Sequence, residues 1–112
     1  LKYVTDRVNT PVMADESAFS PLQAIDLIQQ RAADIINIKL MKTGGLSNAI
    51  RVADIAALHG VPCMIGCMLE SSISVAAAVH LAVAKSDVIT KIDLDGPSLC
   101  AFNPPTGGVT FD

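Results

Sequence analysis

Two ionisable residues, Asp15 and Lys39, each follow a short apolar run, and they lie 24 residues apart in the chain. The runs cover residues 12–15 and 35–40. A carboxylate or an ammonium group at such a place is costly to bury unless it is paired, bound to a metal ion or exposed at the end of a strand. Two such strand ends in successive units, joined by a helix, predict one shared site.

The composition limits the classes of ligand. The chain has 112 residues, enough for one small domain, of which 51% are hydrophobic and only 17% charged, against about 25% charged residues in an average globular protein. Such a chain either packs most of its length internally or lacks a partner. A net charge of −3 without a Lys/Arg cluster argues against nucleic acid or an anionic membrane as a ligand.

The cysteines and the apolar segments indicate the cellular compartment. Cys63, Cys67 and Cys100 show no paired metal-ligand spacing. In a strand, Cys63 and Cys67 would be about 13 Å apart, too far for a disulfide. The Ala-rich segment 73–84 is too short to cross a membrane. We therefore expect a reducing, cytoplasmic setting.

A strand–helix unit repeats along the chain. Apolar runs begin near residues 12, 36, 63 and 90, a period of about 25 residues, and the first three are followed by helical patterns. The first helix is predicted to begin at Ser20-Pro21, with Gln23 at the capping-box position. The second is predicted from about Ser47 to Leu58, before Gly60. The third follows Ser71-Ser72, is rich in Ala and should be deeply packed. The repeat predicts a parallel sheet with right-handed crossovers.

Two architectures are built from such units. A doubly wound sheet would carry a Gly-rich fingerprint after its first strand, and none is present. A (β/α)8-type barrel places its active groups at the carboxyl ends of its strands. The residues that fall at these ends are Asp15, Lys39, Glu70, Asp93 and Asp95. We favour the barrel, and because a barrel needs about 200 residues or more, this chain would be only its second half.

Alternation along the strands supports this choice. Asn37 and Lys39 share one face of their strand, whereas Ile36 and Ile38 share the other. The apolar face would meet the helices, and the polar face would look into the barrel mouth. The same polar face is expected to hold Met13 with Asp15, and Lys91 with Asp93 and Asp95.

At these residues the chain resembles the enolase superfamily, specifically its muconate-cycloisomerase subgroup. The matching motifs are PVMADES at residues 11–17, NIKLMKTGGL at 37–46, CMLES at 67–71 and DLDGP at 93–97. The resemblance covers essentially the whole chain. It implies an α/β fold in which residues 1–112 form the C-terminal half of an enolase-type (β/α)7β TIM barrel, with about four βα units and without the capping domain.

The resemblance also implies roles for the strand-end residues. The fifth barrel strand of the family ends in the third carboxylate ligand of an essential Mg²⁺, which matches Asp15, and the sixth carries a catalytic lysine, which matches Lys39. Removing a proton next to a carboxylate creates a doubly charged enolate, which needs a hard cation and a nearby base. A lysine near a cation and partly desolvated is expected to have a lowered pKa. The family's other two metal ligands and second lysine are absent here.

The eighth-strand motif narrows the substrate. In the dipeptide epimerases of the subgroup an Asp-x-Asp receives the α-ammonium of the substrate, and Asp93 and Asp95 reproduce it. Met68 matches a position that lines the same pocket. The resemblance therefore implies epimerisation of a dipeptide of the L-Ala-D/L-Glu type. The alternative is a purely structural role, in which both aspartates cap the turn before Gly96-Pro97.

Other functions remain open at this point. The same half-site is compatible with a chloromuconate or muconate cycloisomerase, or with an N-acylamino-acid racemase. A different class is a non-catalytic fragment that self-associates or works beside a complementary N-terminal half. Glu16 and Lys42 are expected to be supporting or loop residues, and Glu70 could equally contact ligand or interact with the start of the following helix.

Overall fold

The computed structural model describes residues 1–102, 106 and 109. Its centre is a four-stranded sheet in the order β1-β2-β3-β4, and all three neighbouring pairs are parallel. The strands are β1 (Met13–Ala14), β2 (Ile35–Lys39), β3 (Cys63–Gly66) and β4 (Ile89–Asp93). The predicted repeat and parallel sheet are confirmed, with strands slightly shorter than the apolar runs.

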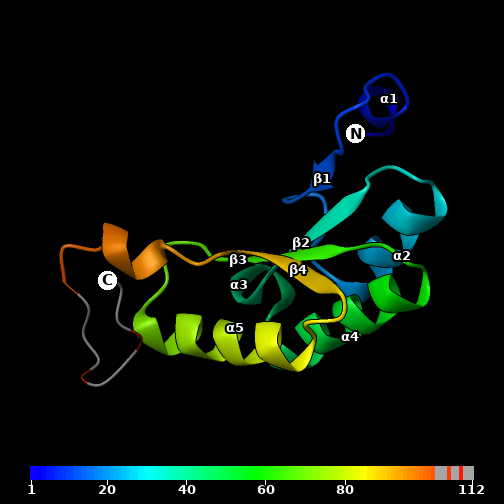
Figure 1. Cartoon of the computed structure of the whole chain (residues 1–112). Helices are drawn as coiled ribbons and strands as arrows, with labels where there is room; N and C mark the ends of the chain where they lie inside the picture. Colours follow the sequence, from blue (N-terminus) through cyan, green and yellow to red (C-terminus); the bar gives the residue numbers. More distant parts are fainter. Residues whose placement is uncertain (103–105, 107–108, 110–112) are drawn as a thin grey trace.

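Helices follow the first three strands. They are α2 (Pro21–Gln29), α3 (Leu40–Thr43) with α4 (Leu46–Leu58), and α5 (Ser72–Ala84); α1 (Lys2–Thr5) precedes the sheet and the 3-10 helix η1 (Gly96–Leu99) follows β4. In Figure 1, α4 and α5 run along one side of the sheet. The short helices α1 and α3 were not predicted. In α3 the chain turns immediately after β2 and stops at Gly44, whose φ of 75° is readily adopted by glycine.

The start of α2 was largely predicted. The hydroxyl oxygen of Ser20 accepts a hydrogen bond from the backbone N–H of Gln23, with an N···O distance of 3.3 Å. The Gln23 side chain reaches back to the N–H of Phe19 at 2.7 Å, one residue earlier than the expected capping-box partner. Ser20 and Gln23 together fix where the first crossover turns into helix.

The register aligns the polar face of the sheet. Lys39 pairs with Gly66, and Gly66 pairs with Asp93, so these three residues form a row across β2, β3 and β4. Paired residues of a parallel sheet point to the same side. An irregularity between Cys63 and Met64 shifts the β3–β4 register by one residue and brings Asp93 into the row. The predicted sharing of one face by the polar strand-end residues is therefore confirmed for Lys39 and Asp93.

The core lies between the sheet and the helices. Ile36, Ile38 and Ile65 point to the helices and are at most 1% exposed. They meet small residues, chiefly Ala49, Ala53 and Ala56 of α4, each 0% exposed. Burial of this apolar surface stabilises the fold by about 25 cal/mol for each Å² removed from water. Small helix residues allow the close approach of helix to sheet.

The prediction that α5 is deeply packed is wrong for one side of that helix. Val75, Ala78 and Leu81 are buried, but Ile73 is 66% and Val83 72% exposed. Among the described residues, α5 packs mainly against α4, β3 and η1, and Ile73 and Val83 lie outside these contacts. No helix in the described part of the chain is long and apolar enough to cross a membrane.

Candidate functional site

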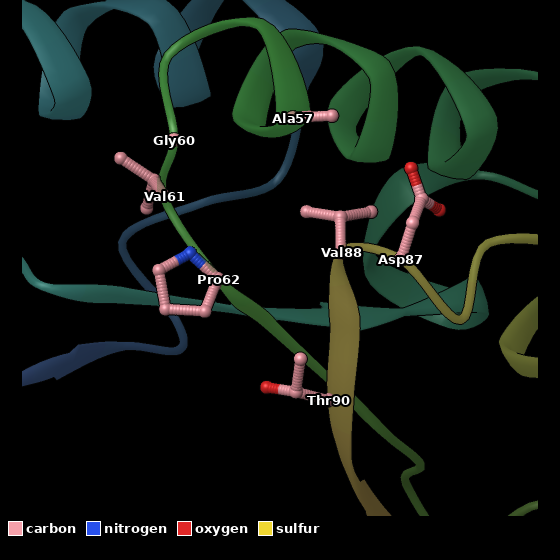
Figure 2. A pocket seen from close by; sticks show the side chains of 7 residues that line it. All are labelled: Ala57, Gly60, Val61, Pro62, Asp87, Val88 and Thr90. Atoms are coloured by element: carbon pink, nitrogen blue, oxygen red, sulfur yellow. The ribbon is translucent and has the colours of Figure 1, made fainter.

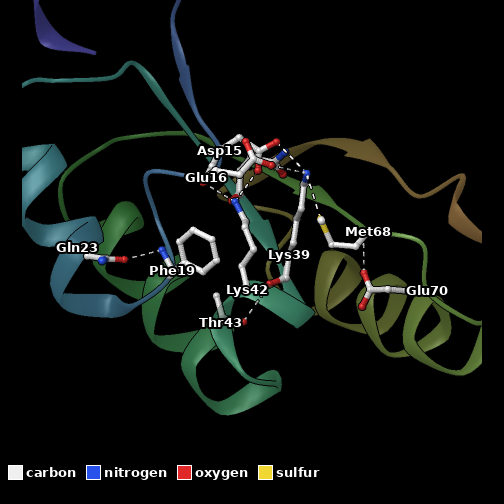
Figure 3. Close-up of polar contacts among 10 residues, drawn as sticks. Asp15, Glu16, Phe19, Gln23, Lys39, Lys42, Thr43, Met68 and Glu70 are labelled. Atoms are coloured by element: carbon white, nitrogen blue, oxygen red, sulfur yellow. Dashed lines mark hydrogen bonds and ion pairs between the residues drawn. The ribbon is translucent and has the colours of Figure 1, made fainter.

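Asp15 and Lys39 meet at the carboxyl ends of β1 and β2. The Lys39 Nζ lies 2.8 Å from Oδ2 of Asp15 and 3.5 Å from Oε1 of Glu16 (Figure 3). The Lys39 side chain is 12% exposed and that of Asp15 is 30% exposed. Parallel pairing of β1 with β2 makes this encounter possible, because it places both strand ends at the same edge of the sheet. The structure thus brings together the two residues from which the site was predicted.

Lys42, which the sequence predicts to be a supporting or loop residue, lies in direct contact with Asp15. Its Nζ contacts three acceptors: Oδ1 of Asp15 at 2.5 Å, the backbone oxygen of Asp15 at 2.5 Å and the backbone oxygen of Asn37 at 3.0 Å. Its side chain is only 3% exposed. The one signal in the sequence was a second lysine three residues after Lys39, and only the unexpected helix α3 shows that Lys42 turns back toward β1.

The charges around Asp15 shift three pKa values. Burial raises the pKa of the Asp15 carboxyl, but hydrogen bonds from Lys39 and Lys42 outweigh burial and lower it. Burial lowers the pKa of Lys39, but Asp15 and Glu16 outweigh it, so the pKa is raised. Burial dominates at Lys42 and lowers its pKa despite the contact with Asp15. The raised pKa of Lys39 follows from its carboxylate neighbours Asp15 and Glu16. The expectation of a lowered pKa applies to Lys39 beside a bound cation and stays a prediction.

Asp15 fits one ligand position for a hard divalent cation. It is a partly exposed carboxylate at a strand end, and Mg²⁺ binds carboxylate oxygens. Within the described residues, no group of three or more His, Cys, Asp or Glu side chains could hold a metal ion. The described part of the chain therefore offers at most two such carboxylates in one place, and a complete metal site would need ligands from elsewhere.

Met68 and Glu70 occupy the loop between β3 and α5. The Met68 Sδ lies 3.8 Å from the Nζ of Lys39, which places Met68 beside this lysine. Glu70 is 7% exposed and accepts hydrogen bonds from the backbone N–H of Met68 at 2.8 Å and from the hydroxyl of Ser74 at 2.6 Å. Its carboxylate therefore holds the loop and the first turn of α5, and does not face Lys39 (Figure 3).

Asp93 and Asp95 are exposed, on either side of the buried Leu94. Asp95 is the residue before η1, yet its side chain makes no capping hydrogen bond; its backbone oxygen accepts one from the Ser98 hydroxyl at 2.6 Å. Neither carboxylate is hydrogen-bonded or ion-paired within the described part of the chain. This leaves both carboxylates available to a ligand, and the turn-capping interpretation is not borne out for Asp95.

The loops after β3 and β4 are in close contact. The N–H of Gly96 points to Sγ of Cys67 at 3.3 Å. A Cβ added at Gly96 would lie 2.5 Å from the backbone oxygen of Met68, closer than real side chains approach. Glycine at this position therefore lets the Asp95 loop pack directly against the loop that carries Met68.

Two hollows lie outside this cluster. A cavity of about 230 Å³ is found at the amino-terminal ends of β3 and β4, where Asp87 is its one charged lining residue (Figure 2). A more open groove of about 590 Å³ lies between the starts of α4 and α5, next to Leu46 and Leu69. Neither is lined by Asp15 or Lys39.

Comparisons with known proteins identify the family and the fold of the chain. The family model for enolase C-terminal domain-like proteins matches residues 1–111. The L-Ala-D/L-Glu epimerase of Clostridium acetobutylicum is 59% identical over 112 residues, which are 100% of this chain and 31% of that protein. The structure of a substrate-liganded complex of the L-Ala-D/L-Glu epimerase from Bacillus subtilis has a TM-score of 0.92 at 46% identity, over 99% of this chain and 31% of that one.

A further solved structure is the dipeptide epimerase from Enterococcus faecalis complexed with Mg and the dipeptide L-Leu-L-Tyr. It has a TM-score of 0.92 at 48% identity, over 98% of this chain and 31% of that one. The chain thus spans about 31% of the length of these relatives. The expectation that it corresponds to the C-terminal part of an enolase-type barrel is confirmed. The chain belongs to the enolase C-terminal domain-like family.

Proposed function

We propose that this chain forms the C-terminal barrel strands of a Mg²⁺-dependent dipeptide epimerase. The observation that carries the proposal is the contact of Lys39 with Asp15 at the carboxyl ends of adjacent parallel strands, 2.8 Å apart. A relative of 59% identity bears the name L-Ala-D/L-Glu epimerase, and a dipeptide epimerase of 48% identity is solved with Mg and a dipeptide. The reaction is removal and return of the proton on the carbon next to the substrate carboxylate.

Lys39 carries the proton on one face of the substrate. As the neutral amine it removes the proton from one stereoisomer, and as the ammonium ion it returns a proton to form that isomer. The contacts with Asp15 and Glu16 favour the ammonium, which is the proton-donating form. Asp15 would help to hold Mg²⁺, and the ion would supply positive charge that stabilises the negative charge formed on the substrate carboxylate when the neighbouring carbon loses its proton.

Asp93 and Asp95 receive the α-ammonium group of the dipeptide. Their support is twofold: Asp93 shares a face with Lys39 through Gly66, and neither carboxylate has a cationic partner among the described residues. A carboxylate without a protein partner can form charge-assisted hydrogen bonds with a ligand ammonium. Met68 borders the site beside the Lys39 amine.

The isolated chain is expected to be inactive. Its described part offers at most two carboxylates in one place, where an oxygen-bound Mg²⁺ takes several ligands. Activity belongs to the complete barrel, in which this chain is joined with the strands that supply the remaining ligands. A muconate cycloisomerase or an N-acylamino-acid racemase remains the alternative, and neither would need two free carboxylates to hold an ammonium.

The test is α-proton exchange in D2O, measured by NMR on the complete barrel with Mg²⁺ and the dipeptides L-Ala-L-Glu and L-Ala-D-Glu. We expect Lys39→Ala to abolish exchange from one stereoisomer and to spare exchange from the other. The matched control is Lys85→Ala, because Lys85 is also ion-paired, 2.6 Å from Asp54, but lies at the end of α5. Equal loss from both isomers, together with loss of Mg²⁺ binding, would contradict the role of Lys39 on one face.

A further inference from the structure

The ammonium group of Lys42 has a complete set of hydrogen-bond acceptors. An ammonium group has three N–H donors, and Lys42 Nζ has three acceptor atoms within 3.0 Å. Two of them, the backbone oxygen and Oδ1, belong to Asp15 at the end of β1, and the third is the backbone oxygen of Asn37 in β2. Lys42 therefore joins the end of β1 to the backbone of β2 in addition to contacting a carboxylate.

The two lysines contact different oxygens of the Asp15 carboxylate. Lys42 holds Oδ1, and Lys39 lies on Oδ2 (Figure 3). Rotation of the carboxylate would break the contact between Lys42 and Oδ1 while the Asp15 backbone stays fixed by the same ammonium. Lys39 makes no bond to the Asp15 backbone, and its other contacts are with Glu16 and Met68. Lys42 therefore restrains the carboxylate, whereas Lys39 can leave Oδ2 without disturbing it.

We propose that Lys42 is a positioning residue that fixes the Asp15 carboxylate, so that only Oδ2 is presented to a divalent cation. This inference rests on the proposed function, because it assumes that Asp15 is the ligand for Mg²⁺. It assigns different tasks to two lysines that touch the same side chain. Lys42 orients the Asp15 carboxylate. Lys39, which carries the proton, contacts Oδ2 of Asp15 until the cation binds to that oxygen.

The proposal can be separated from a simple effect of charge. If Lys42 acted only as a positive charge near the metal site, its removal would relieve repulsion and Mg²⁺ would bind more tightly. If Lys42 fixes the ligand, its removal weakens binding, because partners that orient metal ligands typically account for 10- to 100-fold in metal affinity. The two accounts predict opposite signs for the same variant.

The experiment is calorimetric titration of Mg²⁺ into the complete barrel and its variants Lys42→Met and Lys39→Met. We expect Lys42→Met to raise the Kd for Mg²⁺ by roughly tenfold or more, and Lys39→Met to leave it unchanged or lower it. Epimerase kinetics give a second readout: in Lys42→Met, saturating Mg²⁺ should restore most of kcat. Loss of kcat that no concentration of Mg²⁺ restores would show a general structural role and would overturn the proposal.

A second variant covers the case in which Lys42→Met does not fold. Lys42→Arg keeps the charge, but its planar guanidinium cannot place donors on the same three acceptors, so we expect weakened Mg²⁺ binding here too. Binding by Lys42→Met or Lys42→Arg as tight as in the unmutated protein would overturn the proposal. Absence of Mg²⁺ binding by the unmutated barrel would instead refute the proposed function, and the two failures are thereby distinguished.

Discussion

The side chain of Asn37 in β2 lies against Gly66 of the adjacent strand β3, with no space for a Cβ at Gly66. A Cβ at Gly66 would be 2.8 Å from Oδ1 of Asn37 and 3.2 Å from Cε of Lys39. Asn37 is 3% exposed, and within the described residues its Oδ1 has no hydrogen-bond partner. Glycine at the end of β3 is therefore what allows the Lys39 side chain to extend along the sheet toward Asp15.

The Gly66→Ala variant tests this contact. The added methyl group must displace Asn37 or the Lys39 stem, and a misplacement of about 1 Å in a reacting group can cost about 10²-fold in rate. We expect kcat of the complete barrel to fall by about that factor, with an overpacking cost of about 1–3 kcal/mol in unfolding free energy. Kinetics and denaturant unfolding measure the two effects.

The control is Ile65→Val, in the same strand but on the face that meets the helices. It should cost about 0.5–1.5 kcal/mol of stability and leave kcat unchanged. A Gly66→Ala protein with full kcat would show that Lys39 tolerates the displacement.

The Asp95→Asn variant tests recognition of the substrate ammonium. Because Asp95 has no partner among the described residues, its charge is free to pair with a ligand, and its loss should raise KM for L-Ala-L-Glu by at least tenfold while changing KM for an N-acetylated analogue little. Steady-state kinetics on both substrates measure the difference. Asp87→Asn, at the opposite ends of the strands, is the control and should change neither KM. Better turnover of the acetylated substrate or of a muconate by the unmutated protein would replace the dipeptide assignment with one of the alternatives.

Thiol labelling of the chain should follow burial. Burial raises the pKa of Cys63 to about 12 and also raises that of Cys67, whereas Cys100 is exposed. The thiolate is the reactive form, so at pH 8 the disulfide reagent DTNB should label Cys100 first, Cys67 more slowly and Cys63 only on unfolding. Fast labelling of Cys63 at pH 8 in the folded chain would contradict the packing of β3.

The isolated chain should self-associate. The edges of the sheet, β1 and β4, have no further partner strand within the described residues, and Ile92 of β4 is 64% exposed. Open edges and exposed apolar surface favour pairing with a second copy. Sedimentation at high micromolar concentration should show a dimer or a larger assembly, which Ile92→Lys weakens. Leu58→Lys, on the 85% exposed Leu58 at the end of α4, is the control, and a monodisperse unmutated monomer would count against the prediction.

Much of the fold was determined locally and could be predicted from the sequence. The apolar runs at a regular spacing specify parallel strands with helical crossovers, because alternation and helical periodicity are properties of neighbouring residues. Ser20, Gln23 and Gly60 mark helix ends for the same reason. Asp15 and Lys39 could be paired in advance because the carboxyl ends of parallel strands lie at one edge of a sheet.

The tertiary structure alone decided how the site residues share their contacts. Lys42 has the sequence signature of an ordinary loop lysine, and only the turn of α3 after β2 buries it against Asp15. The irregularity between β3 and β4 placed Asp93 in the same row as Lys39. The side chains of Asn37 and Lys39 leave no space for a Cβ at Gly66, which is why glycine is required there. The direction in which the pKa of Lys39 is shifted likewise depended on which carboxylates surround its amine. Such contacts join residues distant in sequence, and their distances follow from packing, which no local pattern of residues specifies.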